Sequence, residues 1–325
     1  MKIAFVGKGG SGKTTLAALF ARHLIASTPQ PLELLAIDAD VNQHLAAALG
    51  ATVDEAVMLP ALGDQVHRIK EYLRGANPRI ESADAMVKTT PPGRGSRLLR
   101  VAEPNPVYDA LVREVAGVRL AVTGPFATED LGIASYHGKV GAVELLLNHL
   151  VDLPGEYVLV DMTAGADSFA SGLFTRFDLT FLVCEPTLRS VGVYRQYAGY
   201  AAEYGVRVVV VGNKVDDVAD VDFLRDHAGD DLVTFLSRSD WVRAAERGSA
   251  RPVDELEPAN VAALAAMRAE ADACVKDWSR YTSQAVEFHV RNAVAWGGDS
   301  SGDDLVGQVD PEFTLGPDAL ATRFR

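Results

Sequence analysis

The sequence predicts an α/β fold, with a doubly wound, mainly parallel sheet flanked by helices. Short apolar runs of strand length alternate with helix-length segments along most of the 325 residues. Several runs are continuously apolar, which is typical of strands buried on both faces of a sheet. A glycine-rich segment also follows the first run directly and precedes a helix-like segment, which places a loop at the carboxyl end of a strand.

The alternation of apolar and amphipathic segments predicts where each strand and helix lies in the sequence. Strands are expected at residues 3–6, 32–37, 98–102, 119–122, 157–160, 179–184, 206–211 and 232–236. Helices are expected near residues 14–26, 42–49, 62–74, 139–150, 188–204, 240–248 and 259–284. In the first of these helices, for example, Leu16, Phe20 and Leu24 fall on one face. Residues 76–97 are expected to form a loop.

Composition and charge narrow the class of protein. Apolar residues make up 48% of the chain and charged residues 23%, which suits a folded core. The formal net charge of −13 makes nucleic-acid binding unlikely, because that function needs a basic face. Cys184 and Cys274 stand far apart, so we expect a reducing compartment and no disulfide framework. No apolar run reaches the ~20 residues of a membrane span, and we expect a cytoplasmic protein without a signal peptide or membrane anchor.

The segment from Gly7 to Thr15 satisfies the phosphate-binding pattern G-x-x-x-x-G-K-[ST]. Glycines let the backbone wrap closely around phosphates, and the N-terminus of the following helix adds positive potential. Lys13 is expected to reach the β- and γ-phosphates, and the Thr14 hydroxyl to bind Mg²⁺. The residues expected to contact the nucleotide here are Gly9, Gly10, Ser11, Gly12, Lys13, Thr14 and Thr15.

Acidic residues follow two further expected strands. Asp38 and Asp40 come directly after residues 32–37, and Asp161 follows residues 157–160. Two carboxylates one residue apart suit a site near the γ-phosphate, where one holds a Mg²⁺-bound water and the other orients the attacking water. Asp161 is expected to bind Mg²⁺ through water, and Gly165 to swing its N–H toward the γ-phosphate.

The segment Asn213-Lys214-Val215-Asp216 resembles the base-reading N-K-x-D pattern of GTPases. Asn213 is expected to bond the N7-side edge of a purine, and Lys214 to pack over the base. An aspartate at the position of Asp216 accepts hydrogen bonds from guanine N1 and N2, which have no counterpart in adenine. Asp216 alternatively caps the next turn, and we favour ATP over GTP. Arg238 is a further expected contact to the nucleotide.

Together these motifs resemble the MinD/ParA group of P-loop ATPases, which also includes ArsA and the nitrogenase iron protein. Lys8 lies inside the loop and gives Lys-Gly-Gly-x-Gly-Lys-Thr-Thr, which looks like the deviant loop of that group. The resemblance implies that Lys8 reaches across a nucleotide-sandwich homodimer to the partner's phosphates. It also implies that Asp40 positions the attacking water and that Asp38 binds magnesium through water.

Within that group, the chain looks most similar to the CooC branch, accessory ATPases for nickel insertion into carbon monoxide dehydrogenase. The residues that carry this resemblance are the loop at 7–15, Asp38-Ala39-Asp40, and residues 90–93, 161–165 and 211–215. That branch has a metal-binding C-x-C pair after the strand that matches residues 120–124, and this chain has no cysteine there. Glu129, Asp130 and His137 follow that strand instead and suit a harder metal, although such residues are more often solvated.

The resemblance implies an ATPase that binds and hydrolyses ATP·Mg²⁺ in a homodimer and signals to an unidentified client protein. Turnover is expected to be slow and stimulated by that client. Three alternatives stay open: a nucleotide-gated scaffold with little hydrolysis, a GTPase, and a metallochaperone with non-cysteine ligands. The nucleotide-binding domain is expected over residues 1–285. Residues 286–325 are expected to be an acidic, partly flexible extension that docks back through Phe313, Leu315, Leu320 and Phe324.

Overall fold

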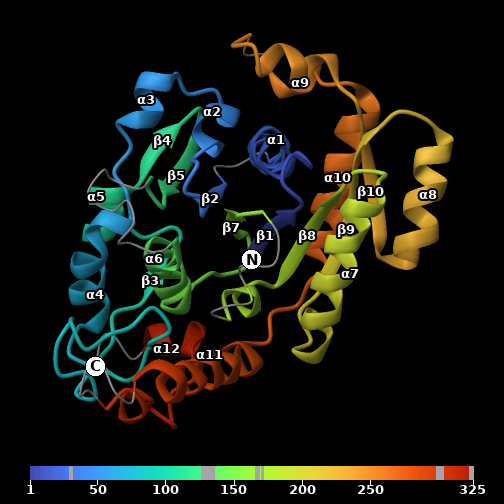
Figure 1. The fold of residues 1–325 in the computed structure, drawn as a ribbon. Coiled ribbons are helices and arrows are strands. Elements are labelled where there is room, and N and C mark those ends of the chain that lie inside the picture. The colour runs from blue at the N-terminus through green and yellow to red at the C-terminus, as the bar shows by residue number, and fades with distance from the viewer. Residues whose placement is uncertain are drawn as a thin grey trace.

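The computed structural model describes residues 1–28, 32–125, 136–164, 169, 172–249, 251–297 and 304–321. Its centre is an eight-stranded sheet in the order β10-β9-β8-β1-β7-β2-β5-β4 (Figure 1). Every neighbouring pair of strands is parallel except β4 with β5. The strands are β1 (Lys2–Gly7), β2 (Glu33–Asp38), β4 (Arg113–Val115), β5 (Val118–Val122), β7 (Glu156–Asp161), β8 (Leu179–Cys184), β9 (Val208–Val215) and β10 (Leu232–Ser237). A separate parallel pair consists of β3 (Leu99–Arg100) and β6 (Leu150–Val151).

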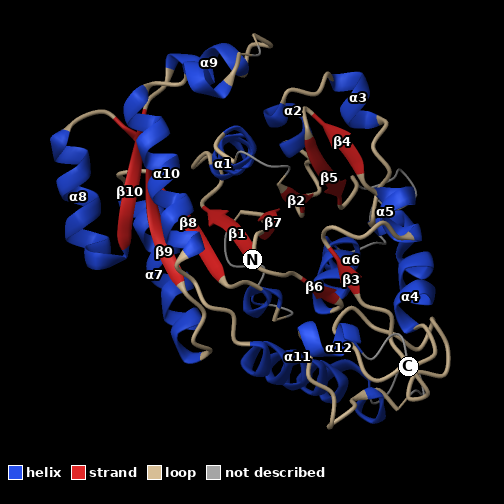
Figure 2. Cartoon of the chain, turned by 180° about the vertical axis from the view of Figure 1, so that it is seen from behind, coloured by secondary structure: helices blue, strands red, loops and turns tan. Residues whose placement is uncertain are grey.

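Helices cover both faces of this sheet (Figures 1 and 2). One face packs against α1 (Lys13–Ala26), α2 (Leu45–Leu49), α9 (Asp240–Ala245) and α10 (Pro258–Asp272). The other packs against α4 (Val66–Arg74), α5 (Pro106–Leu111), α6 (Tyr136–Asn148), α7 (Leu188–Glu203) and α8 (Val218–Ala228). The remaining α-helices of the described residues are α3 (Val53–Val57), α11 (Trp278–Asn292) and α12 (Pro317–Ala321).

The central strands are apolar because they lie between two hydrophobic cores. In β1, Ala4 and Val6 belong to one core, and Ile3 and Phe5 belong to the other. Successive side chains of a strand point to opposite faces, so a strand covered on both faces needs an apolar residue at nearly every position. This is the physical reason for the uninterrupted apolar runs in the sequence.

The predicted α/β class with a mainly parallel sheet is confirmed. The single helix expected at 259–284 is instead two helices, α10 and α11, because Asp277 accepts a hydrogen bond from the backbone N–H of Arg280 (2.9 Å) and starts a new helix. Four of the described helices, α3, α5, α8 and α12, were not expected, and the strand expected at 98–102 has only the two residues of β3.

The described C-terminal segment, residues 304–321, packs against the loop at 76–97 and against α11. Helix α11 runs across residue 285, the expected boundary. Arg94 donates from Nε to Asp310 Oδ2 (2.9 Å) and so joins the loop to the segment. Among the residues expected to dock, Leu315 is buried, Phe313 and Leu320 are partly buried against the same small cluster, and Phe324 lies outside the described residues.

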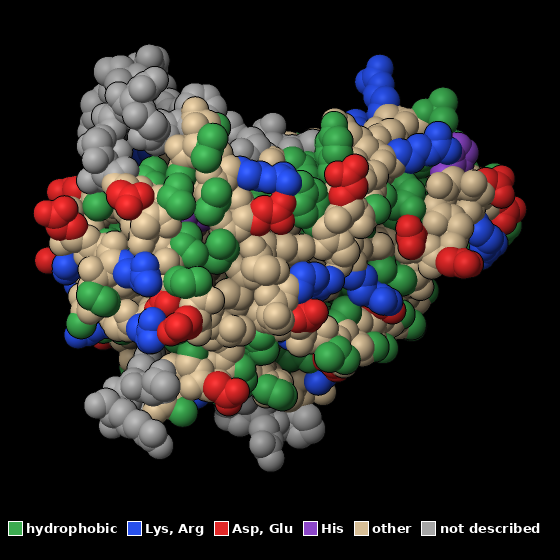
Figure 3. Space-filling view, turned by 90° about the horizontal axis from the view of Figure 1, so that it is seen from below, with side chains coloured by type: hydrophobic (Ala, Val, Ile, Leu, Met, Phe, Trp, Pro, Cys, Tyr) green, Lys and Arg blue, Asp and Glu red, His purple; other side chains and the backbone are tan. Residues whose placement is uncertain are grey.

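Two observations on the described residues bear on the expected partners. None of the described helices combines the length and the hydrophobicity needed to cross a bilayer. On the face drawn in Figure 3, the acidic and basic side chains of the described residues are interspersed rather than gathered by sign. Nucleic-acid binding usually needs a basic field, and no such field dominates that face.

Candidate nucleotide and magnesium site

The predicted phosphate-binding loop connects β1 to α1, at the carboxyl edge of the sheet. Gly10 (φ 81°) and Gly12 (φ 92°) have left-handed backbone conformations, which residues with a Cβ rarely adopt. Gly12 is the N-cap of α1, and with no side chain it leaves the first helical N–H groups for another acceptor. The backbone N–H of Ser11 donates to Lys8 O (3.0 Å) and closes the turn. The loop therefore has the form of an anion cradle.

The loop is held from the side by the end of β9. Asn213 Nδ2 donates to Ser11 O (2.7 Å), and Lys214 Nζ donates to Gly10 O (2.5 Å). A Cβ added to Gly12 would lie 2.3 Å from Asn213 Nδ2 and would have to displace that amide, and its φ of 92° is strained for any other residue, so this position favours glycine. Lys214 itself has φ 59°, a strained conformation for a residue with a side chain. Both residues expected near the purine thus contact the phosphate-binding loop directly.

Lys13 lies in the first turn of α1 with Asp40 as its ionic partner. Its Nζ is 4.0 Å from Asp40 Oδ2, and both side chains are largely buried. Asp40 Oδ1 accepts hydrogen bonds from the backbone N–H (3.0 Å) and Nδ2 (2.7 Å) of Asn42. Asp40 is therefore fixed beside the lysine that is expected to bind the γ-phosphate.

Asp38 is the last residue of β2 and is fully buried. Its carboxylate accepts from the backbone N–H groups of Asp40 (3.1 Å) and Leu45 (2.9 Å). Burial raises the pKa of Asp38 to about 6, against the lowering effect of these two hydrogen bonds. The carboxyl thus ties the start of α2 to the end of the strand.

Asp161 ends β7, directly beside Asp38 in the sheet register. It is 1% exposed, and among the described residues neither of its carboxylate oxygens has a hydrogen-bond partner. Burial raises the pKa of Asp161 to about 8, and the negative charge of Asp38 raises it further. Lys13 and the Thr14 hydroxyl lower it, but not enough to offset burial. A buried carboxyl of this kind is costly unless a cation binds to it.

These residues fit a magnesium ion. Mg²⁺ prefers oxygen ligands, keeps several waters and binds beside one or two carboxylates and the phosphates of a nucleotide. The orphaned oxygens of Asp161, the buried carboxyl of Asp38 and the Thr14 hydroxyl supply such a set near the loop. The described residues hold no cluster of three or more His, Cys, Asp or Glu side chains arranged as a metal site. Glu129, Asp130 and the side chain of His137 lie outside the described residues.

Glu185 was not among the residues predicted for the site. It follows β8 directly, and its carboxylate contacts Lys214 Nζ (Oε1, 2.8 Å) and Lys8 Nζ (Oε2, 3.6 Å). Burial alone would raise the pKa of Glu185, but Lys214 and Lys8 hold it below its ordinary value. Its position after a buried strand was the available signal, because such strand ends face the ligand.

The other residues predicted to contact the nucleotide lie near the phosphate-binding loop, except Gly165, which is not among the described residues. Gly9 is exposed at the loop, and Thr14 and Thr15 lie in the first turn of α1. Asp216 pairs with Arg238, whose Nε donates over 2.8 Å. The alternative that Asp216 caps the next turn is wrong, because Asp217 caps α8.

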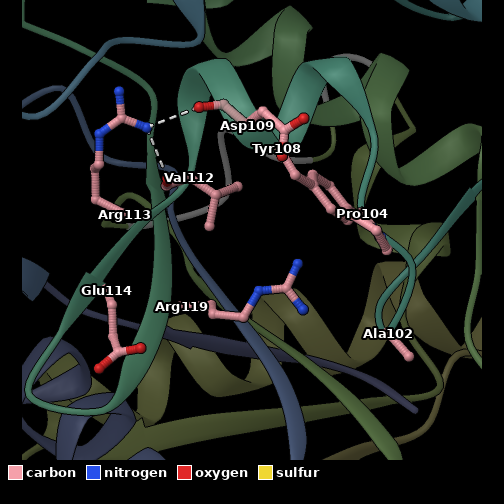
Figure 4. A pocket seen from close by; sticks show the side chains of 8 residues that line it. All are labelled: Ala102, Pro104, Tyr108, Asp109, Val112, Arg113, Glu114 and Arg119. Carbon is pink, nitrogen blue, oxygen red and sulfur yellow. Dashed lines mark hydrogen bonds between the residues drawn. The ribbon is translucent and has the colours of Figure 1, made fainter.

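A concavity of about 310 Å³ lies elsewhere, beside β4, β5 and α5 (Figure 4). Arg113 donates from Nη1 to the backbone oxygens of Asp109 (3.2 Å) and Val112 (2.8 Å) at its rim. None of the predicted site residues lines it, so we assign it no part in nucleotide binding. Its lining residues are Ala102, Pro104, Tyr108, Asp109, Val112, Arg113, Glu114 and Arg119.

The chain matches no family model. It is 29% identical over 262 residues to the carbon monoxide dehydrogenase accessory protein CooC of Rhodospirillum rubrum, which covers 80% of this chain and 91% of that protein. Its fold is similar to that of the septum site-determining protein MinD of Pyrococcus horikoshii, a complex with Mg-ADP (TM-score 0.54, 15% identity, 84% and 96% of the two chains). It is also similar to that of the MinC:MinD cell division complex of Aquifex aeolicus (TM-score 0.53, 18% identity, 85% and 97%).

Proposed function

We propose that this chain is a P-loop ATPase of the MinD/ParA type, an ATP-driven switch that forms a homodimer and signals to a client protein. The observation that supports this most is the buried carboxyl of Asp161 beside Lys13 and Thr14, whose oxygens accept no hydrogen bond from any residue that the structure describes. A folded chain tolerates such a group at a site where a ligand supplies the missing charge.

In the proposed reaction, the loop binds the triphosphate of ATP. The N–H groups of residues 9–15 and the Lys13 ammonium bind the phosphate oxygens. Thr14, Asp38 and Asp161 would hold Mg²⁺, directly or through water. When bound, Mg²⁺ neutralises charge on the β- and γ-phosphates. Lys13 is paired with Asp40 in the free chain, so an arriving γ-phosphate takes over the lysine and leaves the Asp40 carboxylate to accept a hydrogen bond.

Asp40 then orients the water that attacks the γ-phosphorus. Its second oxygen stays fixed by Asn42, so the carboxylate is held in one orientation. The new bond joins water oxygen to phosphorus, and the bond to the β-γ bridging oxygen breaks with its electron pair going to ADP. Both protons of the water leave on inorganic phosphate. The products are ADP and phosphate.

Lys8 is the residue proposed to complete the partner's site in the dimer. In the free chain its Nζ donates to Gly9 O (2.9 Å) and lies near Glu185, with a third of the side chain exposed. The side chain is therefore held at the surface, where a second protomer can take it up. ATP would favour the closed dimer, hydrolysis would reopen it, and the client would respond to the difference.

Phosphate release and ATP binding test the nucleotide part of this proposal. We expect Lys13→Ala to weaken ATP·Mg²⁺ binding by about 100-fold, because it removes a charged phosphate contact. Asp40→Ala should still bind ATP but release phosphate about 100-fold more slowly. Lys70→Ala, on α4, is the matched control and should leave both values unchanged. Equal hydrolysis by wild type and Asp40→Ala would contradict the assigned role and favour the scaffold alternative.

A further inference from the structure

Asp216 and Arg238 form an ion pair at the carboxyl edge of the sheet. They directly follow β9 and β10, two parallel strands in which Ser237 is in register with Val215. The backbone N–H of Arg238 donates to Val215 O (3.3 Å), so the two chain segments stay side by side beyond the strands. The register of the sheet therefore sets this pair, in addition to the side chains themselves.

The guanidinium covers the open edge of the carboxylate. Arg238 Nε lies 2.8 Å from Asp216 Oδ2 and 2.8 Å from Oδ1. Because Arg238 Nε is equally close to both carboxylate oxygens of Asp216, it occupies the position where a ligand with two hydrogen-bond donors would bind. The two side chains are 63% and 56% exposed, so a ligand in solution can reach them.

The pair lies on the nucleotide side of the sheet. Asn213 and Lys214, on β9 shortly before Asp216, hold the phosphate-binding loop through Ser11 O and Gly10 O. In the strand order, β8, β9 and β10 extend from β1 toward one side of the loop. The base of a nucleotide bound at the loop would extend over this edge, toward Asp216.

The two purines differ in what they offer to a carboxylate. Guanine presents two donors, N1–H and N2–H, which match the two oxygens of an aspartate. Adenine has an acceptor at N1, which a bare carboxylate repels, and only its N6 amine can donate. We propose that Arg238 sets the base preference of this chain by covering the carboxylate of Asp216, which disfavours guanine relative to adenine. The inference rests on the nucleotide-binding function proposed above.

The expected size of the effect follows from the exposure of the pair. Guanine must displace Arg238 to reach Asp216, and an exposed ion pair is broken at small cost. Removing the guanidinium should therefore raise the ratio of GTP to ATP affinity about fivefold. Inosine triphosphate keeps N1–H but lacks the N2 amine, so its affinity should rise less than that of GTP.

The test is the affinity of ATP, GTP and inosine triphosphate, each with Mg²⁺, by isothermal titration. The variants are Arg238→Ala, the double variant Arg238→Ala/Asp216→Ala, and the control Arg225→Ala, which removes another exposed ion pair, with Asp222 on α8. We expect Arg238→Ala to gain affinity for GTP, and the double variant and the control to show no gain.

Other outcomes overturn the inference in distinguishable ways. An unchanged GTP to ATP ratio in Arg238→Ala overturns the inference alone and leaves ATP binding intact. A ratio that changes through a loss of ATP affinity, and changes equally in the double variant, shows that Arg238 contacts the nucleotide without acting through Asp216, and this also overturns it. No binding of any nucleotide by the wild type overturns both the inference and the proposed function.

Discussion

Replacing Asp161 with Asn should stabilise the nucleotide-free chain while removing its response to Mg²⁺. The change keeps the size of a fully buried side chain and removes an ionisable carboxyl that has no hydrogen-bond partner among the described residues. A site that needs a cation carries an energetic cost while the cation is absent. The same substitution should therefore improve stability and abolish function.

The magnitude follows from the pKa of Asp161. Burial raises this pKa from 3.8 to about 8. Between these two values the unfolded chain has released the proton and the folded chain retains it, so stability falls as the pH rises from about 4 to about 8. Four pKa units correspond to at most about 6 kcal/mol. Water that enters the site relieves part of this cost, and we expect the variant to gain about 2 to 4 kcal/mol at pH 8.

The assay is urea unfolding of wild type and Asp161→Asn at pH 5 and pH 8, with and without ATP·Mg²⁺. Burial raises the pKa of Asp38 to about 6, which adds to the same trend in both chains, so the difference between the chains is the relevant quantity. Asp226→Asn, an exposed position on α8, is the control for loss of a negative charge. We expect the advantage of Asp161→Asn to be larger at pH 8 than at pH 5.

With ATP·Mg²⁺ the order should reverse, because only the wild type gains stability from the bound ion. The reasoning is refuted if Asp161→Asn is less stable than wild type at pH 8 without nucleotide. It is also refuted if ATP·Mg²⁺ stabilises both chains equally, because Asp161 would then have no part in binding magnesium.

Two further substitutions test the loop and the C-terminal segment. Gly12→Ala should abolish ATP binding, measured by titration, and lower the free energy of unfolding by about 1–3 kcal/mol, because its Cβ would overlap Asn213 and its φ is left-handed. Gly155→Ala is the control: this glycine also has a positive φ, but a Cβ there meets open space, so ATP binding should persist. Arg94→Ala should lower the stability to urea slightly at pH 7 and less at pH 3. Burial raises the pKa of the Asp310 carboxyl, but the backbone N–H and the guanidinium of Arg94 hold it below its ordinary value, and the variant loses only the guanidinium. Equal losses at both pH values would contradict this.

The parts of the fold that the sequence predicted are those with local signals. The buried strands β1, β7 and β8 appear in the sequence as continuous apolar runs, and the loop at 7–15 carries its own spacing. Helices α3, α5, α8 and α12 were missed. The helix α3 has no buried residue, and α8 buries only Leu224, so their sequences lack the apolar periodicity that predicts a helix.

In the site, too, the sequence predicted residues that a neighbouring motif marks, and it did not predict contacts between residues far apart in the chain. The loop and the three aspartates were predicted because each stands at a strand end, where the sequence alone indicates the edge of the sheet. The contacts of Lys8 and Lys214 with Glu185, and of Arg238 with Asp216, join residues from different strands. Such pairs depend on the strand order, which periodicity does not determine.

The most direct test of the central claim is the size of the protein in solution, measured by light scattering without nucleotide, with ADP·Mg²⁺ and with ATP·Mg²⁺. Wild type, Lys8→Ala, Lys13→Ala and Asp40→Ala are compared while released phosphate is counted. An ATP-driven switch predicts a dimer with ATP that persists in Asp40→Ala and fails to form in both lysine variants. One size under all conditions, with no phosphate released, would contradict it and leave a static nucleotide-binding scaffold.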